Sequence, residues 1–261
     1  MILDSFRVDD RVAVISAASR GIGAAIAVAL AEAGAHVVIG ARSAETLAEV
    51  AGAVEATGRR AVVVPGDLSE RDGMAALVDA AVAELGGIDI VVNNAGGSMP
   101  QPFLDTSERA FEMAMHWNVT TAFNLTQLAT PHLLERPGSS VINIASVAGR
   151  FGSRGFAAYG TAKGALIKLT RHLASDLAPR VRVNAIAPGA IRTDALGSVL
   201  TDELEAAMSA GTPMRRIGEP ADIAAAAVYL ASPAASYVTG ECLAVGGGVE
   251  VSNLEMGIPD L

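Results

Sequence analysis

The 261-residue sequence has little of what marks several common classes of protein. Its one cysteine, Cys242, excludes an intrachain disulfide and fits a reducing, cytoplasmic setting. Positive charge is scarce: the net charge of −9 leaves no footprint for nucleic acid or for an anionic membrane surface. Apolar runs are short, the longest being residues 24–30 and 223–231, and residues 1–10 lack the apolar centre of a signal peptide. We therefore expect a soluble protein.

Metal-ligand spacing is also missing from the sequence. The histidines show no spacing with cysteine or carboxylates that would bind a metal ion, and no metal site is expected; they are His36, His116, His132 and His172. Only His116 is of further interest, because it lies near Asn118. Linkers, repeats and low-complexity tracts are absent as well, and 51% of the residues are hydrophobic. This composition predicts one folded domain over residues 1–261.

Short apolar runs alternate with longer alanine- and leucine-rich segments of helical period. Strands are predicted at residues 11–16, 35–40, 61–64, 88–92, 141–145, 180–185 and 242–245, and helices at 22–33, 44–57, 71–85, 107–134, 157–177 and 220–231. Continuously apolar strands are typical of parallel strands covered on both faces. The pattern predicts an α/β fold, a single Rossmann-type, doubly wound, seven-stranded parallel sheet with helices on both faces.

One segment interrupts this alternation. Residues 192–218 contain a short predicted helix near 202–209 and follow the sixth predicted strand. Folds of this class bind ligands beyond the carboxyl ends of their strands. We therefore expect residues 192–218 to form a lid over the substrate.

A glycine turn follows the first predicted strand. It reads Ser16-Ala17-Ala18-Ser19-Arg20-Gly21-Ile22-Gly23 and opens a helix. Glycines in such a turn let the backbone approach a pyrophosphate at the helix N-terminus. Tight packing of a helix on a strand produces similar turns, but a position after the first strand of a βαβ series favours a dinucleotide site.

The end of the second predicted strand bears on the choice of dinucleotide. It reads Gly40-Ala41-Arg42. An acidic residue near this point would bind the 2′-hydroxyl of NAD, whereas an arginine accommodates the 2′-phosphate of NADP. Arg42 and Arg20 are placed to face that phosphate, although both could be solvated surface residues. The sequence therefore favours NADP(H), with NAD(H) as the alternative.

Further motifs follow in order along nearly the whole chain. They are Asp67-Leu68, Asn93-Asn94-Ala95-Gly96, Tyr159-Gly160-Thr161-Ala162-Lys163 and Pro188-Gly189-Ala190-Ile191-Arg192-Thr193. Together with the glycine turn they resemble the short-chain dehydrogenase/reductase family, and most closely its hydroxysteroid dehydrogenases and 3-oxoacyl-carrier-protein reductases. The family has glycine where this chain has Ala17. The extra methyl group is costly if the turn needs a positive φ and harmless if it does not.

The resemblance implies a dinucleotide-binding site. Asp67 and Leu68 are expected to meet the adenine, the Asn94–Gly96 turn to lie beside the nicotinamide ribose, and the segment after Pro188 to contact the carboxamide. The expected cofactor contacts are Ser16, Ala17, Ser19, Arg20, Gly21, Ile22, Gly23, Arg42, Asp67, Leu68, Asn94, Ala95, Gly96, Tyr159, Lys163, Pro188, Gly189, Ile191 and Thr193.

The Tyr159–Lys163 spacing carries the predicted chemistry. Residues four apart on a helix lie on one face, about 5–6 Å apart at Cβ. Free tyrosine titrates near ~10, and we expect the neighbouring ammonium and the positive nicotinamide of the oxidised cofactor to lower the pKa of Tyr159 into the range of general acid–base chemistry. The predicted reaction is hydride transfer between a nicotinamide and a ketone or secondary alcohol.

The resemblance implies a catalytic tetrad of Asn118, Ser146, Tyr159 and Lys163. In it Ser146 binds the substrate oxygen, Tyr159 exchanges the proton, Lys163 holds the ribose, and Asn118 ties a water to Lys163. Two of these residues have a structural alternative to the catalytic role: Ser146 as a turn residue, and Asn118 as the cause of a helix kink or as a polar core residue.

The loops expected around the substrate are rich in apolar side chains. These are Met99, Phe103, Val147, Phe151, Phe156, Leu196, Val199, Leu200, Met208 and Met214. They favour a hydrophobic, steroid-like or lipid-like substrate, although they could equally be core. The alternative is a 3-oxoacyl-carrier-protein reductase, whose acidic partner would be met by Arg136, Arg150, Arg154, Arg171 and Arg180.

Two other classes of function are less favoured. A catalytically silent dinucleotide-sensing protein would usually lack the tyrosine or lysine, and both are present. An epimerase of the extended relatives would need a larger domain after Gly189 than the sequence provides. The family also implies a homotetramer, or a homodimer, in which helices 107–134 and 157–177 pack against a second subunit and the tail 249–261 reaches a neighbour.

Overall fold

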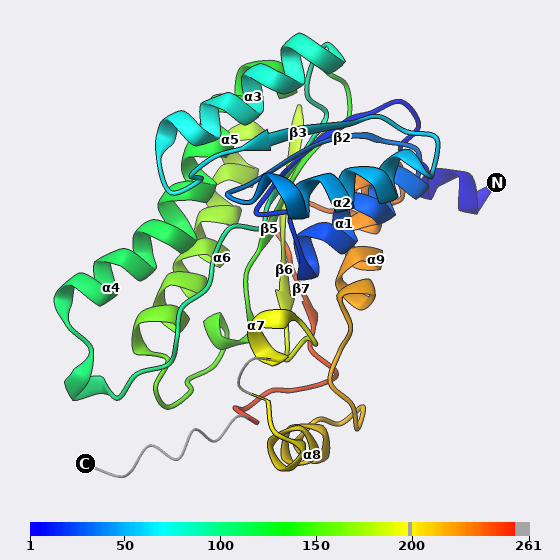
Figure 1. Ribbon diagram of the computed structural model, residues 1–261. Coiled ribbons are helices and arrows are strands. Elements are labelled where there is room, and N and C mark those ends of the chain that lie inside the picture. The colour runs from blue at the N-terminus through cyan, green and yellow to red at the C-terminus, as the bar shows by residue number, and fades with distance from the viewer. Residues whose placement is uncertain (198–199, 254–261) are drawn as a thin grey trace.

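A parallel sheet forms the centre of the computed structural model, which describes residues 1–197 and 200–253 (Figure 1). Its seven strands are β1 (Val12–Ser16), β2 (His36–Ala41), β3 (Ala61–Pro65), β4 (Ile90–Asn93), β5 (Ser139–Ile144), β6 (Val181–Pro188) and β7 (Cys242–Val245). They lie in the order β3-β2-β1-β4-β5-β6-β7, and every pairing is parallel. The predicted fold class is confirmed.

Helices cover both faces of the sheet, which is why its strands are continuously apolar (Figure 1). Helices α1 (Gly21–Glu32), α2 (Ala44–Glu55) and α9 (Pro220–Ala231) pack on one face, in a cluster that includes Ile15 and Ile39. Helices α3 (Arg71–Leu85), α5 (Thr121–Leu134) and α6 (Ala157–Leu177) contribute to the cluster on the other face, around Val14 and Val38. Alternate residues of β1 thus enter different cores.

Most predicted elements are present with small shifts at their ends. The bounds of α3, α6, α9 and β7 agree with the prediction, and Ser43 caps α2 by accepting a hydrogen bond from the Thr46 N–H at 3.3 Å. Short 3₁₀ helices are present at η1 (Ile2–Phe6), η2 (Phe103–Asp105), η4 (Val147–Gly149) and η5 (Pro233–Ala235).

The predicted continuous helix 107–134 is wrong. It consists of α4 (Glu108–Met115), a π-helical turn η3 (His116–Thr120) and α5. The Asn118 side chain donates to the Ala114 carbonyl at 2.9 Å, and so competes for an acceptor of the helical backbone. An amide side chain that inserts into the hydrogen-bond ladder in this way accounts for the wider turn.

The interruption after β6 lies beneath the carboxyl ends of the strands (Figure 1). It contains α7 (Asp194–Gly197) and α8 (Asp202–Gly211). Arg192 donates hydrogen bonds to Glu205 of α8 and to Glu219 at the start of α9, so it ties the two helices together. Val199 and residues 254–261 of the tail lie outside the described residues. Within residues 1–197 and 200–253, no helix is both long and apolar enough to span a bilayer.

Candidate active site

The loops after β1 and β4 meet where the strand order reverses, because these strands are neighbours in the sheet. Ser16 Oγ accepts hydrogen bonds from the Asn94 N–H at 3.0 Å and the Ala95 N–H at 3.1 Å. In return, Asn94 Nδ2 donates to the Ala17 carbonyl at 2.9 Å. The structure thus joins two motifs that are almost eighty residues apart in the sequence.

Ala17 adopts the left-handed backbone conformation, with φ of 53°. The turn therefore needs the positive φ that the sequence left open. Glycine adopts this region freely, whereas for an L-residue with a Cβ it costs roughly 1–2 kcal/mol. The structure thus stores strain at the start of the glycine turn.

Glycine at position 23 lets the start of α1 pack closely on the loops after β1 and β4. A Cβ on Gly23 would lie 2.5 Å from Asn94 Nδ2 and 2.6 Å from the Ala17 carbonyl oxygen. Arg20, the N-cap residue of α1, makes no side-chain cap, so the first N–H groups of the helix have no side-chain acceptor there. The N–H groups at an uncapped helix start can bind a phosphate group.

The turn after β6 completes this side of the site. A Cβ on Gly189 would lie 2.7 Å from Gly246 Cα, so Pro188 and Gly189 pack directly against the end of β7. A Cβ on Gly21 would lie 3.2 Å from Thr193 Cγ2. Thr193, at the end of the segment that begins at Pro188, therefore packs against the glycine turn.

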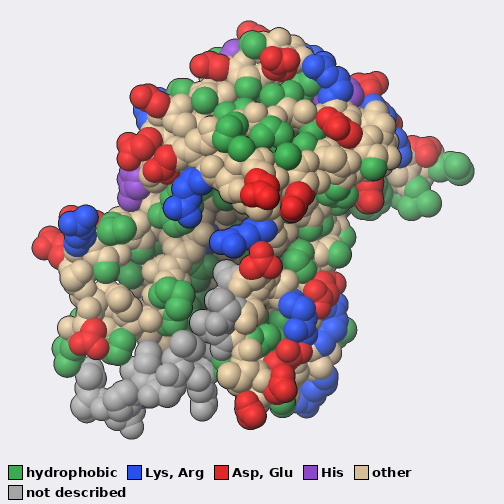
Figure 2. All heavy atoms as spheres, in the orientation of Figure 1, with side chains coloured by type: hydrophobic (Ala, Val, Ile, Leu, Met, Phe, Trp, Pro, Cys, Tyr) green, Lys and Arg blue, Asp and Glu red, His purple; other side chains and the backbone are tan. Residues whose placement is uncertain are grey.

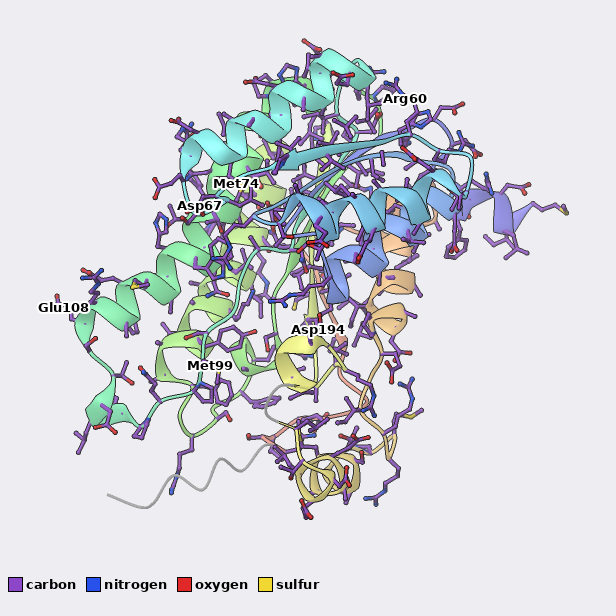
Figure 3. The ribbon with its side chains drawn as sticks, in the orientation of Figure 1. Arg60, Asp67, Met74, Met99, Glu108 and Asp194 are labelled. Carbon is purple, nitrogen blue, oxygen red and sulfur yellow. The ribbon has the colours of Figure 1, made fainter. Side chains whose placement is uncertain are left out.

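Both predicted arginines lie on the surface next to acidic groups. Arg20 Nη1 is 4.0 Å from Asp194 Oδ2, and both side chains are largely exposed. Arg42 helps to hold the pKa of Asp67 below its usual range, but hydrogen bonds from Ser69 contribute more. The Ser69 N–H and Oγ donate to Asp67 Oδ1 at 2.9 and 2.8 Å. Figure 2 shows basic side chains in the middle of one face of the molecule, and Figure 3 labels Asp67 and Asp194.

Lys163 and Asn118 meet beneath Gly96. A Cβ on Gly96 would lie 2.7 Å from both Lys163 Nζ and Asn118 Oδ1, so only glycine fits there without movement. Lys163 is buried, donates to the Ile144 carbonyl at 2.7 Å and lies 5.8 Å from the centroid of the Tyr159 ring. Burial lowers the pKa of Lys163 to about 7.

Asn118 binds the backbone through its side chain. Its Oδ1 accepts from the Gly97 N–H at 2.9 Å, and its Nδ2 donates to the Gly97 carbonyl at 3.1 Å. With Ala114, Gly97 accounts for both amide hydrogens of the side chain. The structure therefore gives the Asn118 side chain a positioning contact with the loop after β4.

The expected lowering of the Tyr159 pKa is not what the surrounding protein groups produce. Burial raises the pKa of the phenol, and a hydrogen bond with the Ser146 side chain acts in the opposite, smaller sense. The Phe156 ring packs 5.9 Å from the Tyr159 ring. Lys163 is close, but burial also disfavours its charged form and so weakens its effect on the phenol. The expectation overlooked how far the pair is buried.

Sequence reasoning missed a polar network behind this site. Asn93 Nδ2 donates to Thr126 Oγ1 at 2.9 Å and to Asn143 Oδ1 at 2.8 Å, and Asn143 Nδ2 donates to Thr170 Oγ1 at 2.9 Å. All four side chains are buried. Polar residues in otherwise apolar strands were the available signal. The network links β4 and β5 to α5 and α6, so it fixes the elements that carry the site.

The predicted substrate walls differ in exposure. Met99 and Met214 are 66% and 65% exposed, whereas Met208 on α8 is buried. Two hydrogen bonds connect segments around this end of the sheet. The Gln101 N–H donates to the Gly155 carbonyl at 2.9 Å, and Asn253 Nδ2 donates to Thr212 Oγ1 at 2.9 Å. Figure 3 shows Met99 and Asp194 below the ends of the strands. Exposed apolar side chains therefore remain around this end of the sheet.

Comparison with known proteins agrees with this geometry. Residues 16–250 match the family model described as enoyl-(acyl carrier protein) reductase. The chain is 56% identical to an uncharacterized oxidoreductase of Mycobacterium tuberculosis, over the whole of both chains. It is 42% identical to the 7alpha-hydroxysteroid dehydrogenase of Escherichia coli, over 96% of this chain and 98% of that protein. It is 37% identical to a 3-oxoacyl-[acyl-carrier-protein] reductase of Vibrio cholerae, over 92% and 98%.

Solved structures show the same likeness. A 7 alpha-hydroxysteroid dehydrogenase complexed with NADH and 7-oxo glycochenodeoxycholic acid superposes with a TM-score of 0.91 at 42% identity, over 94% of this chain and 96% of that one. The sheet, its helices and these matches define an oxidoreductase that acts on CH–OH groups. The chain belongs to the short-chain dehydrogenase/reductase family.

Proposed function

We propose that the protein transfers a hydride between NADP(H) and a hydrophobic ketone or secondary alcohol, with Tyr159 as the general acid and base. The observation that carries the proposal is the meeting of Tyr159, Ser146 and Lys163 at one end of the sheet. The ammonium group lies 5.8 Å from the tyrosine ring centroid, and Ser146 hydrogen-bonds with the phenol. General acid–base catalysis requires such a proton donor next to a group that orients the substrate.

The bound nicotinamide would supply or accept the hydride. In the direction of reduction, the Ser146 hydroxyl orients the substrate oxygen and Tyr159 Oη gives that oxygen a proton. Lys163 Nζ would bind the ribose hydroxyls of the dinucleotide, and a pKa near neutrality suits it to pass a proton back toward Tyr159. Asn118 contributes by holding Gly97, and so the loop that separates Lys163 from solvent.

Four segments would hold the dinucleotide. The uncapped start of α1 receives the phosphates, Asp67 and Leu68 meet the adenine, and the turns after β4 and β6 hold the nicotinamide end. The residues assigned to this site are Ser16, Ala17, Ser19, Arg20, Gly21, Ile22, Gly23, Arg42, Asp67, Leu68, Asn94, Ala95, Gly96, Tyr159, Lys163, Pro188, Gly189, Ile191 and Thr193.

The preference for NADP(H) rests on Arg20 and Arg42. Both guanidinium groups are exposed, and the residue before Arg42 is alanine, so no carboxylate stands at that position to repel a 2′-phosphate. Initial rates with NADPH and NADH test this directly. We expect NADPH to give the higher kcat/KM, and Arg42→Ala to remove at least about tenfold of that preference through KM. Equal or better rates with NADH in the parent protein would contradict the assignment.

The substrate is assigned from the exposed apolar rim and from the relatives. Met99 and Met214 offer apolar surface without fixed charge. The 42% identical relative is a hydroxysteroid dehydrogenase, whereas the 3-oxoacyl-carrier-protein reductase at 37% supports the alternative. Steroid ketones, acetoacetyl thioesters and small ketones should be assayed in parallel. We expect the highest kcat/KM with a steroid ketone; preference for the thioester would favour the alternative, and no turnover at all would favour a binding protein.

Assembly into a homotetramer completes the proposal, with a homodimer as the smaller alternative. Phe111 and Met113 on α4 and Phe123 on α5 are 39%, 60% and 39% exposed, which is unusual for large apolar side chains on one helical segment. Burial of these side chains against a second subunit would remove them from water. Light scattering at micromolar concentration should give four times the mass of one chain, and a monomer would contradict this.

A further inference from the structure

His116 lies at the junction between the two ends of the proposed dinucleotide site. It is the first residue of the π-helical turn η3, and its Nε2 is 2.8 Å from the Ser69 carbonyl oxygen. A carbonyl oxygen only accepts, so this nitrogen carries the proton and donates. Ser69 belongs to the loop after β3, where it also donates twice to Asp67. His116 therefore binds the loop that is proposed to meet the adenine.

The other end of the same turn binds the nicotinamide side. Asn118 follows His116 by two residues and holds both the N–H and the carbonyl of Gly97. Gly97 directly follows Gly96, where a Cβ would clash with Lys163 and Asn118. The π-helical turn η3 thus has one contact with the adenine-side loop and another with the loop over the catalytic lysine.

A π-helical turn is sensitive to such contacts. It is a rare geometry, and here the Asn118 side chain takes the Ala114 carbonyl, an acceptor of the regular backbone ladder. Without the bond to Ser69, the turn would still bind Gly97 but would no longer be hydrogen-bonded to the loop after β3. The contact between helices α3 and α5 would persist, because Arg71 donates separately to Asn124 at 2.9 Å and Gln127 at 2.8 Å.

We propose that His116 is a positioning residue that couples occupation of the adenine side of the site to the placement of Asn118 and of the loop over Lys163. The inference rests on the proposed function, because it assumes that the loop at Asp67 meets the adenine. It predicts that a ligand occupying only the adenine side changes the surroundings of the π-helical turn. The bond that carries this change is the one from His116 Nε2 to the Ser69 carbonyl.

The chain contains a built-in reporter for this coupling. Its one tryptophan, Trp117, lies between His116 and Asn118 and packs partly buried against the core. Its emission therefore reports the π-helical turn without a label. The probe is 2′-phospho-ADP-ribose, which carries the adenine half of NADP and no nicotinamide. Its affinity is measured separately by calorimetry, so binding and the response of the turn are read independently.

Three variants separate the coupling from general effects. His116→Leu removes the donor, and His116→Gln keeps an N–H that can reach the same carbonyl. Arg71→Met breaks the contact between α3 and α5, which lies away from the turn. His116→Ala serves as a second donor-free variant should His116→Leu fail to fold, which its melting transition would reveal.

We expect the parent protein to change its Trp117 emission as the probe saturates. In His116→Leu the probe should bind about 2- to 10-fold more weakly, which corresponds to one hydrogen bond, and the emission change at saturation should be lost. Its kcat should fall about tenfold with substrate KM nearly unchanged, His116→Gln should recover most of both, and Arg71→Met should behave as the parent in both.

The inference is overturned if His116→Leu keeps either the emission change or the kcat of the parent, or if the parent shows no emission change at saturation. The proposed function fails on a separate observation, namely Tyr159→Phe turning over substrate as fast as the parent. An inactive Tyr159→Phe together with a fully active His116→Leu would refute the coupling alone.

Discussion

The two edges of the sheet differ in how their polar groups are satisfied. At the amino edge, arginines donate to carbonyl groups at the ends of helices. Arg60 reaches Glu84 at the end of α3, Arg180 reaches Leu134 at the end of α5, and Arg182 reaches Ala231 and Ser232 at the end of α9. A cation at a helix C-terminus stabilises both the unpaired carbonyl groups and the helix dipole. The arginines of this edge therefore stabilise the fold.

The carboxyl edge departs from such rules repeatedly. Ala17 has a positive φ, α1 begins without a side-chain cap, and a π-helical turn interrupts the longest predicted helix. Lys163 is buried, and its hydrogen bond is to a carbonyl rather than to a carboxylate. Each of these features costs stability, and all of them lie where the cofactor and substrate are proposed to bind. Local costs concentrated at one edge are what a functional site predicts.

The largest expected effect comes from filling the space above the lysine. In Gly96→Ala the new Cβ would lie 2.7 Å from Lys163 Nζ and Asn118 Oδ1, so those groups must move. Displacement of a catalytic group by about 1 Å can cost on the order of 100-fold, and we expect a loss of that size in kcat. The matched control is Gly52→Ala, where no atom lies within 4 Å and activity should stay unchanged. Full activity of Gly96→Ala would contradict the geometry.

Replacement of the buried lysine should stabilise the protein while it abolishes activity. The pKa of Lys163 falls from 10.5 in the unfolded chain to about 7 in the folded protein. The cost of burying the charge is therefore fully present below pH 7 and disappears as pH rises from 7 toward 10.5. Removal of this cost in Lys163→Met should raise the free energy of unfolding by roughly 2 kcal/mol at pH 6. The lost hydrogen bond to Ile144 offsets part of this gain, and the gain at pH 10 should be much smaller.

Urea unfolding at the two pH values measures this difference. The control is Lys168→Met on the same helix, because Lys168 is exposed and its loss should change stability little at either pH. A Lys163→Met protein that is less stable than the parent at pH 6 would show that the ammonium contributes to the fold, as the arginines of the amino edge do.

The amino edge should respond in the opposite way. Arg182→Met removes a partly buried donor to the carbonyl groups of Val238, Ala231 and Ser232. We expect the free energy of unfolding to fall by about 1 kcal/mol, with kcat and KM unchanged. Thermal unfolding and steady-state kinetics on the same preparation check both parts. A change in kcat with little loss of stability would mean that the two edges are not separate in function.

The smallest expected effect is the relief of strain at Ala17. Ala17→Gly removes a Cβ from the left-handed region, and this gain outweighs the greater entropy that glycine gives the unfolded chain. The free energy of unfolding should rise by roughly 0.5 kcal/mol. Ala18→Gly, one residue further on at a fully buried site, should instead lose stability. Equal losses in both variants would mean that the turn is not strained.

The fold was predictable because its signals are local. The apolar runs that became strands and the cap at Ser43 depend on neighbouring residues alone, and several element bounds agree with the prediction. The π-helical turn was not predictable, because it depends on Asn118 competing for the Ala114 carbonyl and on Gly97, which approaches from another loop. Helical periodicity carries no information about either contact.

The proximity of Tyr159 and Lys163 was predictable from the sequence, and their electrostatics were less so. The spacing of Tyr159 and Lys163 was enough to place them together, four residues apart on α6. Their pKa values depend on burial, which the sequence does not express: burial raises the pKa of Tyr159 and lowers that of Lys163 to about 7. The roles of these residues remain proposals that the variants test.

The most direct test of the account compares Tyr159→Phe with the parent protein in a single turnover. The substitution removes the phenol oxygen and keeps the ring that packs on Phe156. Hydride transfer, followed by nicotinamide absorbance, should slow by about 1,000-fold while the dissociation constant for NADPH changes less than about threefold. Hydride transfer at the parent rate, with NADPH bound as tightly, would contradict the assignment of Tyr159 as the acid and base.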